Sequence, residues 1–143
     1  MAINQITIFL ENKAGALLNV TKILADNKVD LRAINIAETA DYGLLRLITA
    51  DNGGAKNVLK AENLIFTETP VLAVAIDDKP GALSGVLEIL AKENIDVNYM
   101  YSIFGHQNGY AYMIMQLGDY DKATKLLKAN GIVIAEPKDL QIG

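Results

Sequence analysis

Two glycine-containing turns hold the residue types best suited to chemistry in this chain. Gly15 and Gly81 each follow a lysine by two positions, within the similar segments Lys13-Ala14-Gly15 and Lys79-Pro80-Gly81. Glycine at a strand-to-helix junction lets a ligand approach the backbone closely. The N–H groups of the first helical turn then point outward and favour an anionic group such as a carboxylate. The turns therefore predict binding of a small anionic group.

Oxygen acceptors accompany both turns. Asn12 and Asp78 stand directly before the lysines, and Asp30 and Asp96 open the strand expected after each helix. We expect these two aspartates to lie at the same end of the sheet as the turns and to contact an ammonium group. A free amino acid presents both a carboxylate and an ammonium. The alternative is that the glycines only permit a tight turn, while Asn12 and Asp78 only cap a helix.

Catalytic and metal-binding groups are scarce. With no cysteine and one histidine, the sequence excludes thiolate chemistry, disulfides and Cys- or His-rich metal sites. The pairs Asp77/Asp78 and Asp119/Asp121 are interpreted as closing a strand and capping a helix, with metal binding as the alternative. His106 is interpreted as an exposed turn residue, with ligand contact or general-base chemistry as the alternative. We predict no catalytic residue, no metal and no cofactor.

Composition narrows the class of protein. The 143 residues are 51% hydrophobic and 21% charged, which is typical of a folded domain. The net charge of −4 and the lack of a basic run argue against a nucleic-acid partner. No apolar stretch reaches the roughly 18–20 residues of a membrane helix. The N-terminal residues do not resemble a signal peptide, so we expect a cytoplasmic protein.

The glycine turns belong to a repeat that extends through most of the chain. Other identical residues are separated by the same interval as Gly15 and Gly81. They are Val20 and Val86, Leu24 and Leu90, Asp30 and Asp96, and Ile48 and Ile114. We therefore predict two domains, residues 1–69 and 70–143. Each half is small for an independent core, so we expect the halves to stabilise each other by packing together.

Hydrophobic periodicity places the turns between strands and helices. Apolar spacings of three and four predict helices, and alternation predicts strands. The first half is predicted to have strands at 5–11, 30–37, 44–50 and 64–69, with helices at 16–28 and 55–61. The second is predicted to have strands at 71–77, 95–104, 110–117 and 132–135, with helices at 81–93 and 119–129. The order β-α-β-β-α-β is that of a ferredoxin-like α/β fold. The connection at Pro70 is too short for a flexible tether, so a fixed mutual geometry is expected.

The hairpin at 97–117 is apolar on both faces. One face is predicted to carry Val97, Tyr99, Tyr101 and Ile103, together with alternate residues of the returning strand from Tyr110. Such a sheet needs a cover, which the other half, a second chain or a ligand can supply. We favour protein packing, because large apolar patches mark interfaces.

The turns resemble the signature loop of ACT domains, the amino-acid-sensing modules of biosynthetic enzymes. The residues that carry the resemblance are Asn12-Lys13-Ala14-Gly15-Ala16-Leu17 and Asp78-Lys79-Pro80-Gly81-Ala82-Leu83. The family pattern is an acidic or amide residue, a variable residue, Pro-Gly, a small residue and Leu. The segments Lys28-Val29-Asp30-Leu31 and Asn94-Ile95-Asp96-Val97 resemble its later Gly-Ile-Asn-Ile segment. The first copy departs from the pattern at Ala14, where the family has proline.

The resemblance implies two ferredoxin-like ACT domains packed as an internal pseudo-dimer, with a free amino acid bound at their interface. It implies ligand contacts from the turn residues at 12, 14–17, 78 and 80–83, and from Asp30 and Asp96. It also implies a stand-alone regulatory protein without catalysis, because two copies use the whole sequence. A homodimer and a metabolic enzyme are the expected protein partners.

Alternatives stay open from the sequence. The chain can be a ligand-free interaction module that regulates an enzyme in trans, or a small enzyme that uses its carboxylates. Arg32, Asn98 and His106 would favour a polar amino acid as ligand. The complete Pro80-Gly81 turn predicts the better ligand loop in the second half.

Overall fold

The computed structural model describes residues 2–39, 41–104 and 110–143, and the predicted turn that holds His106 lies outside them. The chain divides into two compact units. The first repeat unit is Asn4–Thr69 with Ile142–Gly143, and the second is Pro70–Gln141 with the residues up to Ile3. The packing of the halves as an internal pseudo-dimer stays a prediction.

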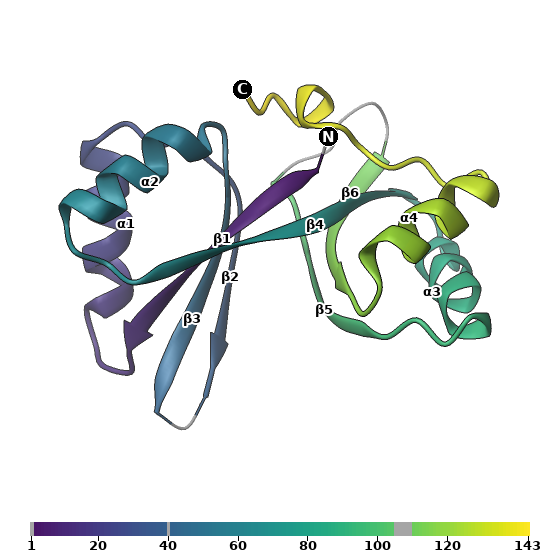
Figure 1. Cartoon of the computed structure of the whole chain (residues 1–143), viewed down its shortest axis with the longest axis horizontal. Helices are drawn as coiled ribbons and strands as arrows, with labels where there is room; N and C mark the ends of the chain where they lie inside the picture. The colour runs from purple at the N-terminus through teal and green to yellow at the C-terminus, as the bar shows by residue number, and fades with distance from the viewer. Residues whose placement is uncertain (1, 40, 105–109) are drawn as a thin grey trace. The chain divides into compact units, whose positions relative to one another are not determined.

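The first repeat unit has the predicted order of elements (Figure 1). They are β1 (Ile3–Glu11), α1 (Ala16–Asp26), β2 (Leu31–Glu38), β3 (Tyr42–Thr49), α2 (Asn52–Ala61) and the start of β4 (Phe66–Asp77). Strand β3 pairs antiparallel with both β1 and β2. The Phe9 N–H donates to the Ile65 carbonyl over 3.0 Å, which joins β1 to the segment that enters β4. The strand order β2-β3-β1-β4 confirms the split βαβ unit of the ferredoxin-like fold.

The second repeat unit repeats this order. After the rest of β4 come α3 (Ala82–Lys92), β5 (Val97–Ser102), β6 (Tyr110–Leu117), α4 (Tyr120–Ala129) and a short 3₁₀ helix, η1 (Pro137–Leu140). The strand order is β4-β6-β5. The predicted last strand at 132–135 is reduced to one bridge, between Val74 and Ile134. Two backbone hydrogen bonds, from Ala75 to Val133 and from Ala135 to Ala73, flank this bridge.

Each unit buries an apolar core between its two helices and one face of its sheet. Figure 1 shows the two helices of each unit on one side of its strands. In the first unit Val20 and Leu24 of α1 pack against strand residues such as Ile8. Their counterparts Val86 and Leu90 pack in the same way in the second core. The repeat interval that is visible in the sequence therefore relates α1 to α3. Ala55 and Leu59 of α2 correspond to Ala123 and Leu127 of α4 at an interval that is two residues longer.

Several predicted boundaries need correction. The strands predicted at 64–69 and 71–77 form one strand, β4, which continues through Pro70. Helix α2 begins at Asn52, ahead of the predicted start at Ala55, because the Asp51 carboxylate accepts a hydrogen bond from the Gly54 N–H over 3.1 Å. This cap overcomes the low helix propensity of the glycines at positions 53 and 54.

The predicted faces of the apolar hairpin are correct except at Val97. A register shift between Val97 and Tyr99 turns Val97 to the side of the helices, where it packs on the core with Met100. Tyr99 and Tyr101 remain together and stack with ring centroids 6.4 Å apart. A bulge adds a residue to one strand, so strict alternation fails across it. What covers the tyrosine face stays a prediction.

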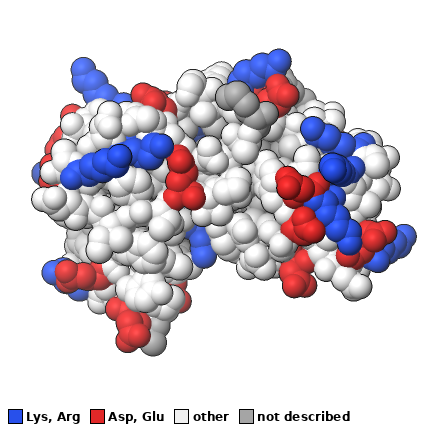
Figure 2. Space-filling model, viewed as in Figure 1, with Lys and Arg blue, Asp and Glu red and all other residues white. Residues whose placement is uncertain are grey.

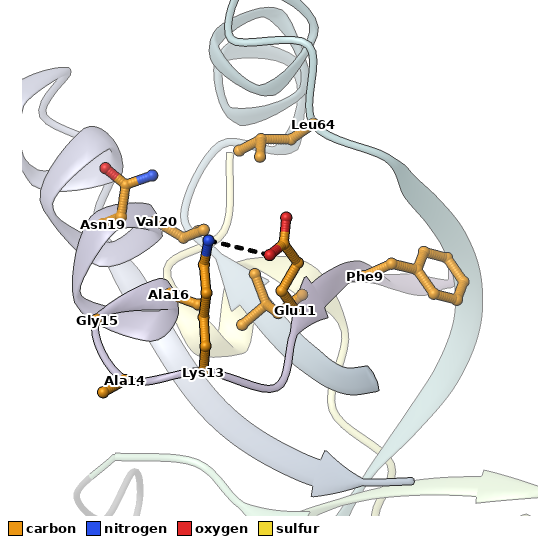
Figure 3. Close-up of a pocket in the computed structure, with 10 residues that line it drawn as sticks. Phe9, Glu11, Lys13, Ala14, Gly15, Ala16, Asn19, Val20 and Leu64 are labelled. Atoms are coloured by element: carbon orange, nitrogen blue, oxygen red, sulfur yellow. Dashed lines mark ion pairs between the residues drawn. The ribbon is translucent and has the colours of Figure 1, made fainter. Parts of the chain in front are cut away.

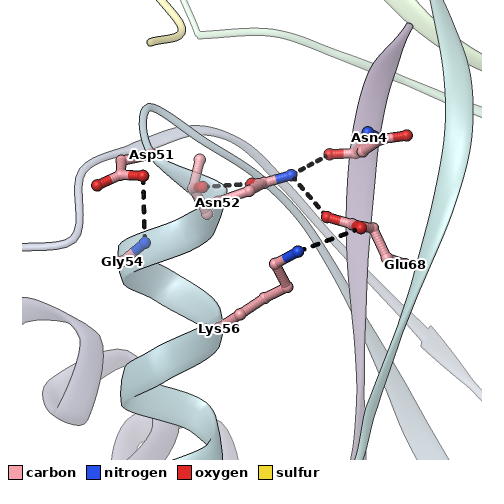
Figure 4. A network of polar contacts seen from close by, with 7 residues as sticks. Asn4, Asp51, Asn52, Gly54, Lys56 and Glu68 are labelled. Carbon is pink, nitrogen blue, oxygen red and sulfur yellow. Dashed lines mark hydrogen bonds and ion pairs between the residues drawn. The ribbon is translucent and has the colours of Figure 1, made fainter.

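The start of α2 is joined to the sheet by a polar network (Figure 4). The Asn52 side-chain amide donates to the Asn4 carbonyl over 2.8 Å and to the Glu68 carboxylate over 3.3 Å. Lys56, one turn further along α2, forms an ion pair with Glu68 over 3.4 Å. These contacts position α2 against both β1 and β4 of the first unit.

Basic and acidic side chains are intermixed on the face shown in Figure 2, without a broad basic area. The absence of a nucleic-acid partner stays a prediction. Within the described ranges, no helix is both long and apolar enough to cross a membrane.

Candidate ligand-binding site

Gly15 and Gly81 adopt the same left-handed conformation at the N-termini of α1 and α3. Their φ angles are 88° and 85°. A Cβ built on either glycine would meet no described heavy atom within 4 Å. Glycine is therefore needed here for its backbone angle, and the space around both turns is open to a ligand.

Neither helix receives a hydrogen bond from a described side chain at its N-terminus. The alternative that Asn12 and Asp78 serve as helix caps is therefore wrong. The Asn12 amide instead donates to the Thr39 carbonyl over 2.9 Å, which ties the first turn to the connection between β2 and β3. The Ala16 and Ala82 N–H groups donate to the Lys13 and Lys79 carbonyls, each over 3.3 Å. The N–H groups that follow them in the first turn keep the donor capacity that a carboxylate needs.

The prediction that Asp30 and Asp96 lie at the same end of the sheet as the turns is wrong. The Ala50 N–H donates to the Asp30 carbonyl over 2.9 Å, beyond the end of β3. Glu11, which leads into the first turn, pairs with Tyr42 at the opposite end of β3. At the usual rise per residue, these two ends are roughly 25 Å apart. Helix α1 returns the chain to the end at which β1 begins, and β2 must start there.

The second unit has the same arrangement. The Gly118 N–H, just after β6, donates to the Asp96 carbonyl over 2.9 Å, so Asp96 also lies far from its turn. In the first unit the Asp30 carboxylate forms an ion pair with Arg32 over 2.7 Å. Asp30 and Asp96 are therefore not part of the site that surrounds the glycine turn of their own unit.

A cavity of about 430 Å³ lies beside the first turn, between the end of β1, the start of α1 and Leu64 (Figure 3). Glu11 and Lys13 form an ion pair of 3.0 Å at one side of it. Both side chains are largely exposed, at 77% and 67%. The remaining lining is apolar except for Asn19: Phe9, Leu10, Ala14, Gly15, Ala16, Val20 and Leu64.

A smaller cavity of about 200 Å³ lies at the corresponding place in the second unit. Several of its lining residues are the repeat counterparts of residues that line the first cavity: Ala75, Ile76, Asp77, Lys79, Ala82 and Val86. Asp77 and Lys79 form an ion pair of 3.8 Å, the counterpart of Glu11 and Lys13. The repeat therefore includes the charged pair as well as the glycine.

The predicted turn residues differ in their surroundings between the two units. Asn12 and Leu17 line a further cavity of about 300 Å³, on the side of the turn that faces Ile36 and Glu38. Leu83, the counterpart of Leu17, packs on the core instead. Asp78, Pro80 and Gly81 form the second turn but do not line the cavity of about 200 Å³.

Glu11 and Glu38 are acidic residues near the turns that the sequence interpretation missed. Asp77 was interpreted only as closing a strand, with metal binding as the alternative. Glu11 and Asp77 are identifiable from the sequence, because they occupy equivalent positions in the repeat and directly precede the turns. Glu38 has no such signal, since only the pairing of Glu38 with Gly43 across β2 and β3 brings it to this end of the sheet. Of the other predicted roles for acidic residues, Asp119 caps α4 through the Lys122 N–H over 3.1 Å.

The fold and the paired glycine turns define a tandem of ferredoxin-like domains with a left-handed glycine and a cavity at each strand-to-helix turn. Residues 1–142 match the family model described as an ACT domain pair. The chain belongs to this family. No curated protein sequence matches it.

Solved structures support the same fold over nearly the whole chain. Protein BT0572 from Bacteroides thetaiotaomicron is 36% identical, with a TM-score of 0.89, and the match covers 99% of this chain and 96% of that one. The ligand-free regulatory subunit of aspartate kinase from Thermus thermophilus is 13% identical, with a TM-score of 0.61 and 90% of each chain covered. At that identity the likeness is one of fold alone.

Proposed function

We propose that this protein is a regulatory sensor that binds a free amino acid at its glycine turns and catalyses no reaction. The observation that carries the proposal is the first turn itself: a left-handed glycine without a side-chain cap, beside a charged pair and an open cavity. Sites of this kind combine a mostly apolar lining with a few polar groups that orient the ligand.

The polar groups match the two ends of an amino acid. The first-turn N–H groups and the Lys13 ammonium suit the carboxylate, and the Glu11 carboxylate suits the ammonium. Glu11 takes the role that the sequence assigned to Asp30, because it lies at the correct end of the sheet. In the second unit Asp77 and Lys79 offer the same pair of charges.

A regulatory role is supported by the family and by the fold that the chain shares with the regulatory subunit of aspartate kinase. A ligand that contacts one arrangement of the domains more strongly than another shifts the population towards the first. We also propose that the protein regulates a metabolic enzyme in trans, forms a homodimer and is located in the cytoplasm.

A specific observation favours the alternative of a ligand-free interaction module. Several large hydrophobic side chains are exposed in the first unit, among them Phe9, Tyr42 and Ile65. Phe9 and Tyr42 are in ring contact, with centroids 5.9 Å apart. An exposed apolar patch of this kind marks a protein interface more often than a small-molecule site.

Binding of the twenty amino acids, measured by thermal shift and then by titration calorimetry, tests the sensor. We expect stabilisation by at least one amino acid, and loss of that binding in Gly15→Val or in Gly81→Val. The Gly85→Ala variant, changed in the middle of α3, is the matched control and should bind normally. If no amino acid binds at millimolar concentration, the sensor is refuted and the interaction module is favoured.

A further inference from the structure

The two equivalent cavities differ by a factor of about two in volume. The cavity of the first unit, about 430 Å³, lies within the range of roughly 300–1,000 Å³ that small-molecule pockets occupy. The cavity of the second unit, about 200 Å³, lies below that range. Volume therefore distinguishes two sites that the repeat makes chemically alike.

The wall that faces the helix contributes different residues to the cavity in the two units. In the second unit Tyr110, Gly131, Ile132 and Val133 all line the smaller cavity. In the first unit Leu64 is the residue of this wall that lines the cavity. Ile65, the counterpart of Val133 by its backbone hydrogen bond to the first strand, lines instead an adjoining open cavity of about 740 Å³. Figure 3 shows Leu64 and the start of α1 on different sides of an open space, with the Glu11–Lys13 pair between them.

The first cavity is polar at one end and apolar at the other. Its deep residues Leu10 and Val20 are buried, at 7% and 2% exposure, and belong to the core of the first unit. Asn19 is the uncharged polar side chain of the lining, and it is exposed at the surface of α1. A ligand side chain that enters towards Val20 loses water and gains no hydrogen-bond partner there, which disfavours a polar or charged side chain.

We propose that the first repeat unit, not the second, holds the ligand, and that the ligand is an amino acid with an aliphatic side chain of the size of valine, leucine, isoleucine or methionine. This inference rests on the proposed sensor function. The ligand ammonium contacts Glu11, its carboxylate contacts Lys13 and its side chain lies against Leu10, Val20 and Leu64. Because Glu11 and Lys13 are both exposed, exchanging their ion pair for contacts to the ligand is thermodynamically cheap.

Matched substitutions in the two repeats test which unit binds. Glu11→Gln and Asp77→Asn each remove one exposed carboxylate from equivalent positions, and neither residue lies in a core. Calorimetric titration with leucine should show a loss of about tenfold or more in affinity for Glu11→Gln, the size expected for a hydrogen bond to a charged group. Asp77→Asn should bind leucine within about twofold of the unchanged protein, as expected for a surface change away from the site.

A ligand series tests the chemical class with the unchanged protein. From alanine to valine to leucine, affinity should rise by about fourfold for each buried methylene. Asparagine, close to leucine in shape, and lysine, close to methionine in length, should bind at least about tenfold more weakly than their aliphatic counterparts.

The outcomes separate this inference from the sensor function. Binding that Asp77→Asn removes and Glu11→Gln spares would overturn the assignment to the first unit. A preference for aspartate, lysine or serine over leucine would overturn the aliphatic class. In both cases the proposed function as an amino-acid sensor would still hold. If no amino acid binds, the inference and the sensor function fail together.

Discussion

Replacing Gly81 by alanine tests whether the left-handed turn before α3 exists in solution. Gly81 has a φ of 85°, and a Cβ would meet no described atom within 4 Å. The substitution therefore adds no clash and leaves only backbone strain. That strain is about 1–2 kcal/mol for a residue other than glycine.

A second effect opposes the strain. Alanine reduces the conformational entropy of the unfolded chain, which stabilises the folded state by about 0.4–1 kcal/mol. The net expectation for Gly81→Ala is a loss of about 1 kcal/mol in the free energy of unfolding. Gly81→Asn should lose less, because asparagine visits the left-handed region more readily.

The same helix offers a matched control. Gly85 lies inside α3, its backbone is not among those with positive φ, and a Cβ there would also meet open space. Gly85→Ala should raise the free energy of unfolding by about 0.5–1 kcal/mol, the usual gain from alanine in a helix interior. Two glycine-to-alanine changes that lie one helical turn apart in the sequence should thus have opposite signs.

Urea denaturation followed by circular dichroism measures both effects. With a slope of about 1–3 kcal/mol per molar urea, a difference of about 2 kcal/mol separates the two midpoints by roughly 1 M. The slopes should agree between variants, so that the midpoints report stability alone. If Gly81→Ala is as stable as Gly85→Ala, then the left-handed turn is not the conformation of the folded protein.

Three further changes test the N-terminal cap of α2, the raised pKa of Tyr120 and the core of the first unit. Asp51→Ala removes the cap of α2 and should cost about 1 kcal/mol in urea denaturation, whereas Asp51→Asn should retain most of that stability; equal loss in both would refute the cap. Burial, with a smaller contribution from a neighbouring aspartate, raises the pKa of Tyr120 above 10.0. Because the unfolded phenol then ionises first, stability should fall as pH rises above about 10, and Tyr120→Phe should flatten this slope; an unchanged slope contradicts it. Leu59→Ala, at a fully buried position, should cost about 2–5 kcal/mol, while Leu18→Ala, at 68% exposure, should change stability by less than about 0.5 kcal/mol; similar losses would contradict the described core.

The elements of each repeat could be predicted from the sequence because their signals are local. Spacings of three and four among Val20, Ile23 and Leu24 are sufficient to predict α1, and their repeat counterparts predict α3. Where the predicted boundary or face of an element was wrong, a single local feature was responsible. The cap at Asp51 extended α2, and the bulge after Val97 moved one side chain to the other face.

The candidate site was only half predictable. The glycine turns followed from residue types and spacing, and their left-handed φ angles agree with that interpretation. The role of Asp30 could not be predicted in this way. Asp30 follows α1 closely in the sequence, but this does not place it near the turn that precedes α1. In a β-α-β unit, the helix returns the chain before the next strand starts, so Asp30 and the Gly15 turn occupy opposite ends of the sheet.

The sequence by itself determined that a ferredoxin-like unit occurs twice and that each copy places a glycine turn and an acid–lysine pair at the end of its first strand. Tertiary structure decided the size of the cavity beside each turn, which is about 430 Å³ in the first unit and about 200 Å³ in the second. Residue identities repeat along a chain, but a cavity is the volume that packed side chains leave unfilled. That volume depends on segments distant in sequence, such as Leu64 in one copy and Tyr110 with Val133 in the other.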